Sequence, residues 1–185
     1  MKPTNVFVLT AGRTGSMTFY KACSMLHNYS VGHESRCGLL GSERFAYPLN
    51  HIEIDCRLVW FLGKLHKYFP ENVYYVHLKR KLEDTAKSWE KRWEREHNML
   101  YGYVNRIMMV GETHIPLLHY AYDMIDTINT NIEDYLVDKS HITIEIDGSD
   151  IISKFYEFLQ IIEARNFRMS EFNTVLTTKN NKSEG

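Results

Sequence analysis

The sequence predicts an α/β fold of three layers, in which a mostly parallel central sheet is flanked by helices on both faces. Two apolar runs, at residues 5–10 and 73–78, do not alternate with polar residues, which is typical of strands buried on both faces of a parallel sheet. Segments with helical periodicity alternate with the strands along the chain. The chain has 185 residues, 44% of them hydrophobic, which is enough for one core, so we expect a single domain over residues 1–185.

Turn residues and periodicity divide the chain into elements that support this class. In the first half we expect a strand at 5–10, a helix ending near 27, a strand at 29–32, a loop at 37–50, a segment at 51–55, a helix at about 57–68 and a strand at 73–78. In the second half we expect helical segments at 82–97 and 99–135, the latter broken near Pro116, a strand at 141–147, a helix after a cap at 148–150, and a polar tail at 177–185.

Charge and composition exclude several classes of function. Lys and Arg number 22 against 23 Asp and Glu, whereas proteins that neutralise nucleic-acid phosphates usually carry a basic excess, so we expect no nucleic-acid partner. No apolar stretch approaches the roughly 20 residues that span a bilayer. The three cysteines have irregular spacing, which indicates free thiols in a reducing compartment. These features predict a cytoplasmic protein without a membrane span.

The turn after the first strand has the composition of an anion-binding loop, with Gly12, Arg13, Thr14, Gly15 and Ser16 in succession. The glycines allow close approach of the backbone, and successive amides at the start of a helix favour an anion. The arginine and the hydroxyls add charge and donors. An ATP or GTP loop would require GxxxxGK followed by Ser or Thr, and both its first glycine and its lysine are missing here. The loop therefore favours a different anion.

This loop resembles the 5′-phosphosulfate loop of sulfotransferases that use 3′-phosphoadenosine 5′-phosphosulfate (PAPS). The family's pattern of Lys/Arg, Ser/Thr, Gly and two further Ser/Thr is matched from Arg13 to Ser16, and Met17 departs from it. The resemblance implies a P-loop fold and transfer of a sulfuryl group from PAPS to an acceptor hydroxyl, with no metal required. It also implies that residues 12–17 bind the cofactor and that Arg13 stabilises charge on the departing phosphate.

A second signature of the same family lies at the strand 73–78. The family binds the cofactor's 3′-phosphate with an arginine at a strand end and a serine eight residues later, and Arg80 and Ser88 have this spacing. The product would be 3′-phosphoadenosine 5′-phosphate (PAP). The family's glycine-rich C-terminal cofactor loop is absent, and the tail with Lys182 is either flexible or a replacement that closes over the cofactor.

Segments 29–35, 51–57 and 60–63 look like a bacterial sulfotransferase-like group associated with surface-glycan synthesis. This similarity implies a carbohydrate, another glycan or a small molecule as the acceptor. Exposed aromatic residues in the middle helices are compatible with a homodimer.

Two sets of residues are candidates for the general base that sulfuryl transfer requires. His33 and Glu34 follow the second strand, as the family's base does, and we expect one to act while the other orients or binds. His51, Glu53 and Asp55 share one face if their segment is extended, and that face either binds the acceptor, supplies the base or is the wet side of a strand. This second set is also the only dense cluster of metal-ligand types, and no metal site is predicted.

Two other classes of function remain open from the sequence. A nucleotide-binding protein without transfer activity, acting as a partner or sensor, is compatible with Met17 and the missing cofactor loop. A small-molecule kinase or NTPase is disfavoured by the loop sequence, although P-loop folds carry out many activities.

Overall fold

A fully parallel five-stranded sheet is the centre of the computed structural model, which describes residues 2–95, 97–111, 113–165 and 169–178. Its strands lie in the order β2-β3-β1-β4-β5, and all four pairings are parallel. The strands are β1 (Asn5–Leu9), β2 (Ser30–His33), β3 (His51–Ile54), β4 (Val73–Lys79) and β5 (His141–Glu145). The predicted three-layer α/β class is confirmed.

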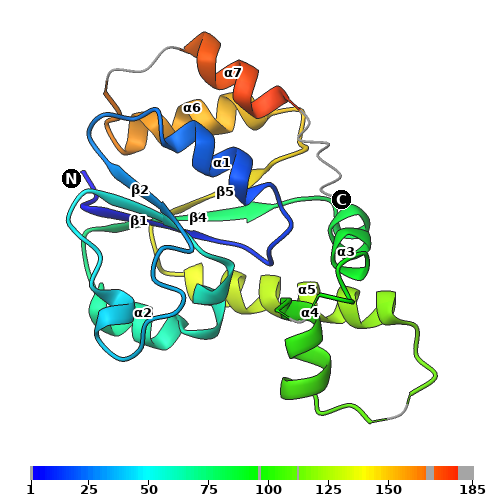
Figure 1. Cartoon of the computed structure of the whole chain (residues 1–185). Helices are drawn as coiled ribbons and strands as arrows, with labels where there is room; N and C mark the ends of the chain where they lie inside the picture. The colour runs from blue at the N-terminus through cyan, green and yellow to red at the C-terminus, as the bar shows by residue number, and fades with distance from the viewer. Residues whose placement is uncertain (1, 96, 112, 166–168, 179–185) are drawn as a thin grey trace.

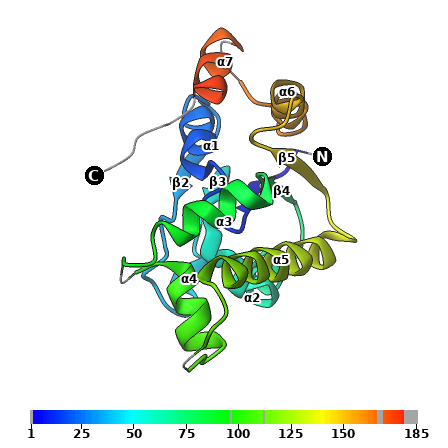
Figure 2. The ribbon, with the colours of Figure 1, turned by 90° about the vertical axis from the view of Figure 1, so that its right-hand side faces the viewer.

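Helices cover both faces of this sheet (Figure 1). One layer consists of α1 (Ser16–Cys23), α6 (Ile151–Ile161) and α7 (Met169–Thr177), and the other of α2 (Leu62–Tyr68), α3 (Leu82–Glu90) and α5 (Leu117–Leu136). Figure 2 shows the same layers from the side, with α3 against α5.

The sequence of β1 explains how both layers are held. Val6 and Val8 pack with the layer of α1 and α6, whereas Phe7 and Leu9 pack with the layer of α2, α3 and α5. Successive residues of a strand point to opposite faces, so a strand covered on both sides must be apolar throughout. All five residues of β1 are buried.

The predicted helix at 57–68 forms as two shorter elements. A 3₁₀ turn spans Cys56–Trp60, and α2 begins at Leu62 after Phe61, whose φ of −129° and ψ of 23° are not helical. The Asp55 carboxylate accepts a hydrogen bond from the Arg57 amide (2.8 Å) and so caps the first turn.

The predicted helix at 82–97 ends early because a side chain competes for its carbonyl groups. α3 ends at Glu90, and the chain continues in turns. The Asn98 side-chain amide donates to the carbonyls of Arg92 (3.0 Å), Trp93 (3.2 Å) and Arg95 (2.7 Å). Asn98 also caps the next helix, because its Oδ1 accepts from the Tyr101 amide at 2.7 Å.

The second half otherwise follows the expected order up to α6, and α7 is an additional helix that was not expected from the sequence. α4 (Met99–Gly102) continues into a π turn at Tyr103–Ile107, and α5 begins at Leu117, directly after Pro116. β5 stops at Glu145, two residues short of the predicted end. None of the described helices is both long enough and apolar enough to pass through a bilayer.

The aromatic contact between α1 and α6 is a test of this packing. Phe158 is fully buried, and its ring lies 5.7 Å from that of Phe19. We expect Phe158→Ala to lower the free energy of unfolding by about 3–5 kcal/mol, because it leaves a cavity in the core. Tyr156→Ala on the same helix is the control, since Tyr156 is 43% exposed, and it should cost much less. Urea denaturation followed by circular dichroism measures both, and equal losses would contradict this packing.

Candidate active site

The carboxyl ends of neighbouring parallel strands meet at one edge of the sheet, and several of the predicted site residues lie there. His33, expected directly after the second strand, is the last residue of β2. The loop after β1 holds the anion-binding motif, Glu34 follows β2, Asp55 follows β3 and Arg80 follows β4. In parallel α/β sheets, ligands bind at this edge.

The loop between β1 and α1 has the backbone of an anion-binding turn. Gly12, Arg13 and Gly15 have φ angles of +73°, +60° and +84°, so the chain turns sharply before α1 begins at Ser16. Left-handed residues beside others in a turn direct successive amides into one concavity. An arginine in this conformation costs about 1–3 kcal/mol, which the surrounding contacts must offset.

Trp89 of α3 holds the loop from the other side. Its indole Nε1 donates to the Ala11 carbonyl at 3.1 Å, and its ring packs against Gly12. A Cβ at position 12 would lie 2.6 Å from that ring, so the close approach requires glycine as well as the positive φ.

The two predicted phosphate-binding motifs contact each other. Arg13 Nε donates to Ser88 Oγ at 3.0 Å, a contact between residues 75 positions apart. Arg80 Nη1 lies 3.5 Å from the Arg13 carbonyl. Within the described residues its other nitrogens make long ion pairs, of 3.8 Å with Asp84 and 3.9 Å with Asp147. Arg80 therefore keeps donor capacity next to the loop, as a site for a second phosphate requires.

A cavity of about 680 Å³ opens beside the loop. Its wall includes the loop residues Gly12, Arg13, Ser16 and Met17, the predicted bases His33 and Glu34, and the aromatic side chains Trp60, Phe61 and Trp89. The wall also carries four more arginines: Arg44, Arg57, Arg92 and Arg95. Its volume is in the range of small-molecule sites.

His33 and Glu34 differ in their partners. His33 Nε2 lies 3.2 Å from Ser16 Oγ, at the first residue of α1. Glu34 instead forms an ion pair with Arg57 at 2.6 Å and accepts from Cys56 Sγ at 3.4 Å. Burial alone would raise the pKa of the Glu34 carboxyl, but the hydrogen bond and charge of Arg57 outweigh burial and hold this pKa below its ordinary value. Glu34 is therefore an ionised carboxylate already committed to a cation.

A buried carboxylate fixes the turn that carries these two residues. Glu53 is fully buried and accepts hydrogen bonds from the Ser35 amide (2.8 Å) and the Ser35 hydroxyl (2.6 Å). Its Oε2 also lies 2.9 Å from His51 Nε2, and His51 Nδ1 lies 2.8 Å from Ser30 Oγ. Gly32 makes room for this carboxylate, since a Cβ there would lie 2.3 Å from Oε2.

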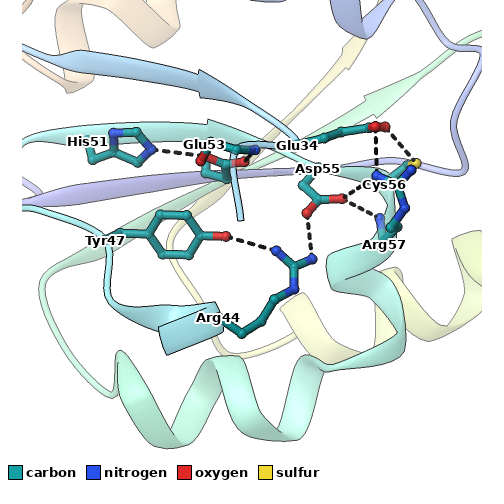
Figure 3. A network of polar contacts seen from close by, with 9 residues as sticks. Glu34, Arg44, Tyr47, His51, Glu53, Asp55, Cys56 and Arg57 are labelled. Atoms are coloured by element: carbon teal, nitrogen blue, oxygen red, sulfur yellow. Dashed lines mark hydrogen bonds and ion pairs between the residues drawn. The ribbon is translucent and has the colours of Figure 1, made fainter. Parts of the chain in front are cut away.

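Asp55 belongs to a second buried network, on the same side of the sheet (Figure 3). Its carboxylate forms an ion pair with Arg44, and both side chains are at least 96% buried. Arg44 also donates to the Tyr47 hydroxyl at 3.4 Å. Removing one partner of such a pair leaves a buried, uncompensated charge and typically costs about 3–5 kcal/mol.

The structure thus places His51, Glu53 and Asp55 in the interior, and not on a wet face as one alternative had it. All three are buried, none is among the described residues that line the cavity, and their polar atoms are engaged by neighbouring groups. The expectation that they bind the acceptor gains no support from this placement.

Glu34, Asp55 and Cys56 bring potential metal-ligand atoms within 4.8 Å of one another. Both carboxylates face arginines, and burial raises the pKa of the Cys56 thiol, which disfavours the thiolate that metals prefer.

The remaining site residues differ in where the structure places them. Thr14 is buried, and its hydroxyl is hydrogen-bonded to that of Thr10. Met17 lies on the cavity wall and is 46% exposed. Lys182 lies outside the described residues. Arg92 and Arg95 were not singled out from the sequence, because the charged run at 82–97 has the composition of an ordinary solvated helix.

Comparison with solved structures gives a match in fold. No protein-family model and no curated protein matches the chain. Among solved structures, the crystal structure of mouse sulfotransferase SULT7A1 complexed with PAP matches with a TM-score of 0.57 and 12% identity. The match covers 96% of this chain and 65% of the mouse protein, so this chain spans less than two thirds of that protein's length. At this identity the likeness establishes a shared fold.

Replacement of Gly12 tests the strained loop. We expect Gly12→Ala to lower the free energy of unfolding by about 1–3 kcal/mol, because alanine resists the positive φ and its Cβ meets Trp89. Gly63→Ala is the matched control, since Gly63 lies in α2 and a Cβ there meets no neighbouring atom. The control should not destabilise the protein. A Gly12→Ala protein as stable as the wild type in thermal unfolding would contradict the loop geometry.

The pH dependence of stability tests the Glu34–Arg57 pair. Because the folded-state pKa of Glu34 is lowered, its contribution is complete above the ordinary glutamate pKa of about 4.3 and is lost as the pH falls through the lowered value. Glu34→Gln should therefore be less stable than wild type at pH 7, and the difference should shrink on acidification. Glu71→Gln, at an exposed position, should show no such trend. Chemical denaturation from pH 7 to pH 3 measures the difference, and a gap that widens on acidification would refute the pairing.

Proposed function

We propose that the chain is a sulfotransferase that moves a sulfuryl group from PAPS to an acceptor hydroxyl. The observation that carries this proposal is the contact between Arg13 and Ser88, with Arg80 beside the Arg13 carbonyl. Two motifs recognised separately in the sequence, one for the 5′ side and one for the 3′-phosphate of the cofactor, come together at one place. The shared fold with a sulfotransferase crystallised with PAP supports the same conclusion.

The residues fit this cofactor. Trp89 and Ile146 pack where a Cβ would lie on Gly12 and Gly15, and both glycines have positive φ. A glycine turn of this kind before a helix suits a phosphosulfate group. In our proposal the loop residues and Arg13 hold that group, and Arg80 with Ser88 holds the 3′-phosphate. When bound, PAPS supplies the sulfuryl group, and the loop amides with Arg13 stabilise negative charge on the phosphate side.

We assign the general base to His33. Its imidazole lies beside Ser16 in the cavity wall, adjacent to the loop, where an acceptor hydroxyl must approach. The Glu34 carboxylate is less suited to accept a proton, because its pKa is lowered and it is already paired with Arg57. In this assignment Glu34 is a positioning residue that orients Arg57 on the cavity wall.

The aromatic wall favours a carbohydrate acceptor. Trp60 and Phe61 lie on the cavity wall and are 36% and 38% exposed, which leaves ring surface for the apolar face of a sugar.

A nucleotide-binding protein without transfer activity is the second candidate function. Met17 favours it, because this methionine lies on the cavity wall where the sulfotransferase family has a hydroxyl residue.

Calorimetric titration with PAP tests the cofactor site. We expect wild type to bind PAP more tightly than 5′-AMP or ATP–magnesium. Arg80→Ala should bind PAP roughly 10–100-fold more weakly, because a charge-assisted contact to a phosphate contributes about 1.5–3 kcal/mol. Lys81→Ala, at the exposed next residue, is the control and should bind like wild type. Unchanged PAP affinity in Arg80→Ala, or a preference for ATP–magnesium, would refute the proposal.

A further inference from the structure

The cavity lies on one side of the anion-binding loop. It touches the loop at Gly12, Arg13 and Ser16 and includes both predicted bases, but Arg80 and Ser88 are not among the described residues on its wall. If the 3′-phosphate binds at Arg80 and Ser88, the cavity is the space left for the acceptor. The chemistry of the acceptor can therefore be inferred from the residues on the cavity wall. This step rests on the proposed function.

That wall carries far more positive than negative charge. Among its described residues are five arginines and one carboxylate, Glu34. Two of the arginines are neutralised locally, since Arg44 pairs with Asp55 and Arg57 pairs with Glu34. Arg13 belongs to the loop and is bonded to Ser88.

The other two, Arg92 and Arg95, are not neutralised by the described part of the chain. No carboxylate of residues 2–95, 97–111, 113–165 or 169–178 lies within 4.0 Å of either guanidinium. Arginine offers planar, forked donors that match carboxylate, sulfate and phosphate groups. Two such side chains on the wall of one cavity are suited to an anion.

Hydrogen bonds hold the backbone that carries these arginines. Asn98 uses its side-chain amide to hold the carbonyls of both residues and of Trp93, and the Arg95 amide donates to the Arg92 carbonyl at 3.0 Å. Trp93 packs against Tyr101, with ring centroids 5.4 Å apart. A prearranged turn reduces the conformational entropy that binding would otherwise remove.

We propose that the acceptor carries an anionic group, which Arg92 and Arg95 bind while its hydroxyl faces His33. A carboxylate, sulfate or phosphate on a sugar ring has this chemistry, with the ring against Trp60 and Phe61. The near-neutral net charge of the whole chain does not indicate an anionic acceptor, because the excess of cationic side chains is confined to the cavity wall.

Two aryl glycosides that differ in one group test the proposal. 4-Nitrophenyl β-glucuronide and 4-nitrophenyl β-glucoside share a scaffold, and only the first has a carboxylate. Each is titrated by calorimetry into protein already saturated with PAP, so that binding is measured without turnover. We expect wild type to bind the glucuronide at least about tenfold more tightly than the glucoside.

The double variant Arg92→Ala/Arg95→Ala should lose this preference, with the two affinities within about twofold, while its affinity for PAP stays unchanged. Arg92→Lys/Arg95→Lys should retain part of the preference, because the charge remains without the fork. Lys91→Ala is the matched control, at an exposed neighbouring position that is not on the described cavity wall.

The outcomes separate this inference from the function on which it rests. Equal affinities for the two glycosides in wild type, no binding of either, or a preference that survives in the double alanine variant would overturn the anionic acceptor while PAP binding stands. Failure of wild type to bind PAP would overturn the sulfotransferase proposal itself.

Discussion

Parallel pairing of β1 with both β3 and β4 brings the anion-binding loop, Arg57 and Arg80 to the same edge of the sheet. The pairing brings the carboxyl ends of strands from distant parts of the sequence to one edge of the sheet. Because helices cover both faces, β1 and β3 are buried along their whole length, and most polar side chains of the site come from the segments that follow the strands. The loop at 12–16, Glu34, Arg57 and Arg80 all occupy such segments. His33 is the exception, as the last residue of β2.

Two buried carboxylates, Glu53 and Asp55, hold the turns that carry residues of the cavity wall. Glu53 and Asp55 are fully buried, and burying a carboxylate is costly unless hydrogen bonds and cations compensate. The groups that compensate each carboxylate belong to the segments around the site. Glu53 accepts from Ser35 and so holds the turn after β2. Asp55 binds Arg44 and caps the turn that begins at Cys56. The same turn carries Arg57, which engages Glu34. The networks thus connect the β3 end to both candidate bases.

Local patterns in the sequence were sufficient for most of the fold. The apolar runs of β1 and β4 and the glycine turn before α1 are short-range signals, and each element formed near its expected position. The helix predicted at 82–97 was too long because Asn98, beyond its end, competes for the carbonyls of the last turns. Periodicity does not reveal such competition.

The candidate site was predictable only where a motif marks it. Arg13, Arg80 and Ser88 could be identified from the spacing of the motifs. That Arg13 contacts Ser88 is known only from the structure. His51, Glu53 and Asp55 were assigned to one face correctly by alternation, but the sequence does not indicate whether that face meets solvent or a covering turn. The role of Arg92 and Arg95 depends on where the cavity lies relative to α3, which no local pattern contains.

The fit of Gly32 against Glu53 has a consequence for how this protein can diverge. The two residues face each other across the β2–β3 pair, and the carboxylate occupies the volume in which any larger residue at position 32 would place its Cβ. A change at position 32 alone displaces the buried carboxylate, and a change at position 53 alone leaves Ser35 and His51 without their acceptor. Homologues that keep this turn should therefore keep or exchange both residues together, and the pair should appear as a co-varying position wherever enough relatives are compared.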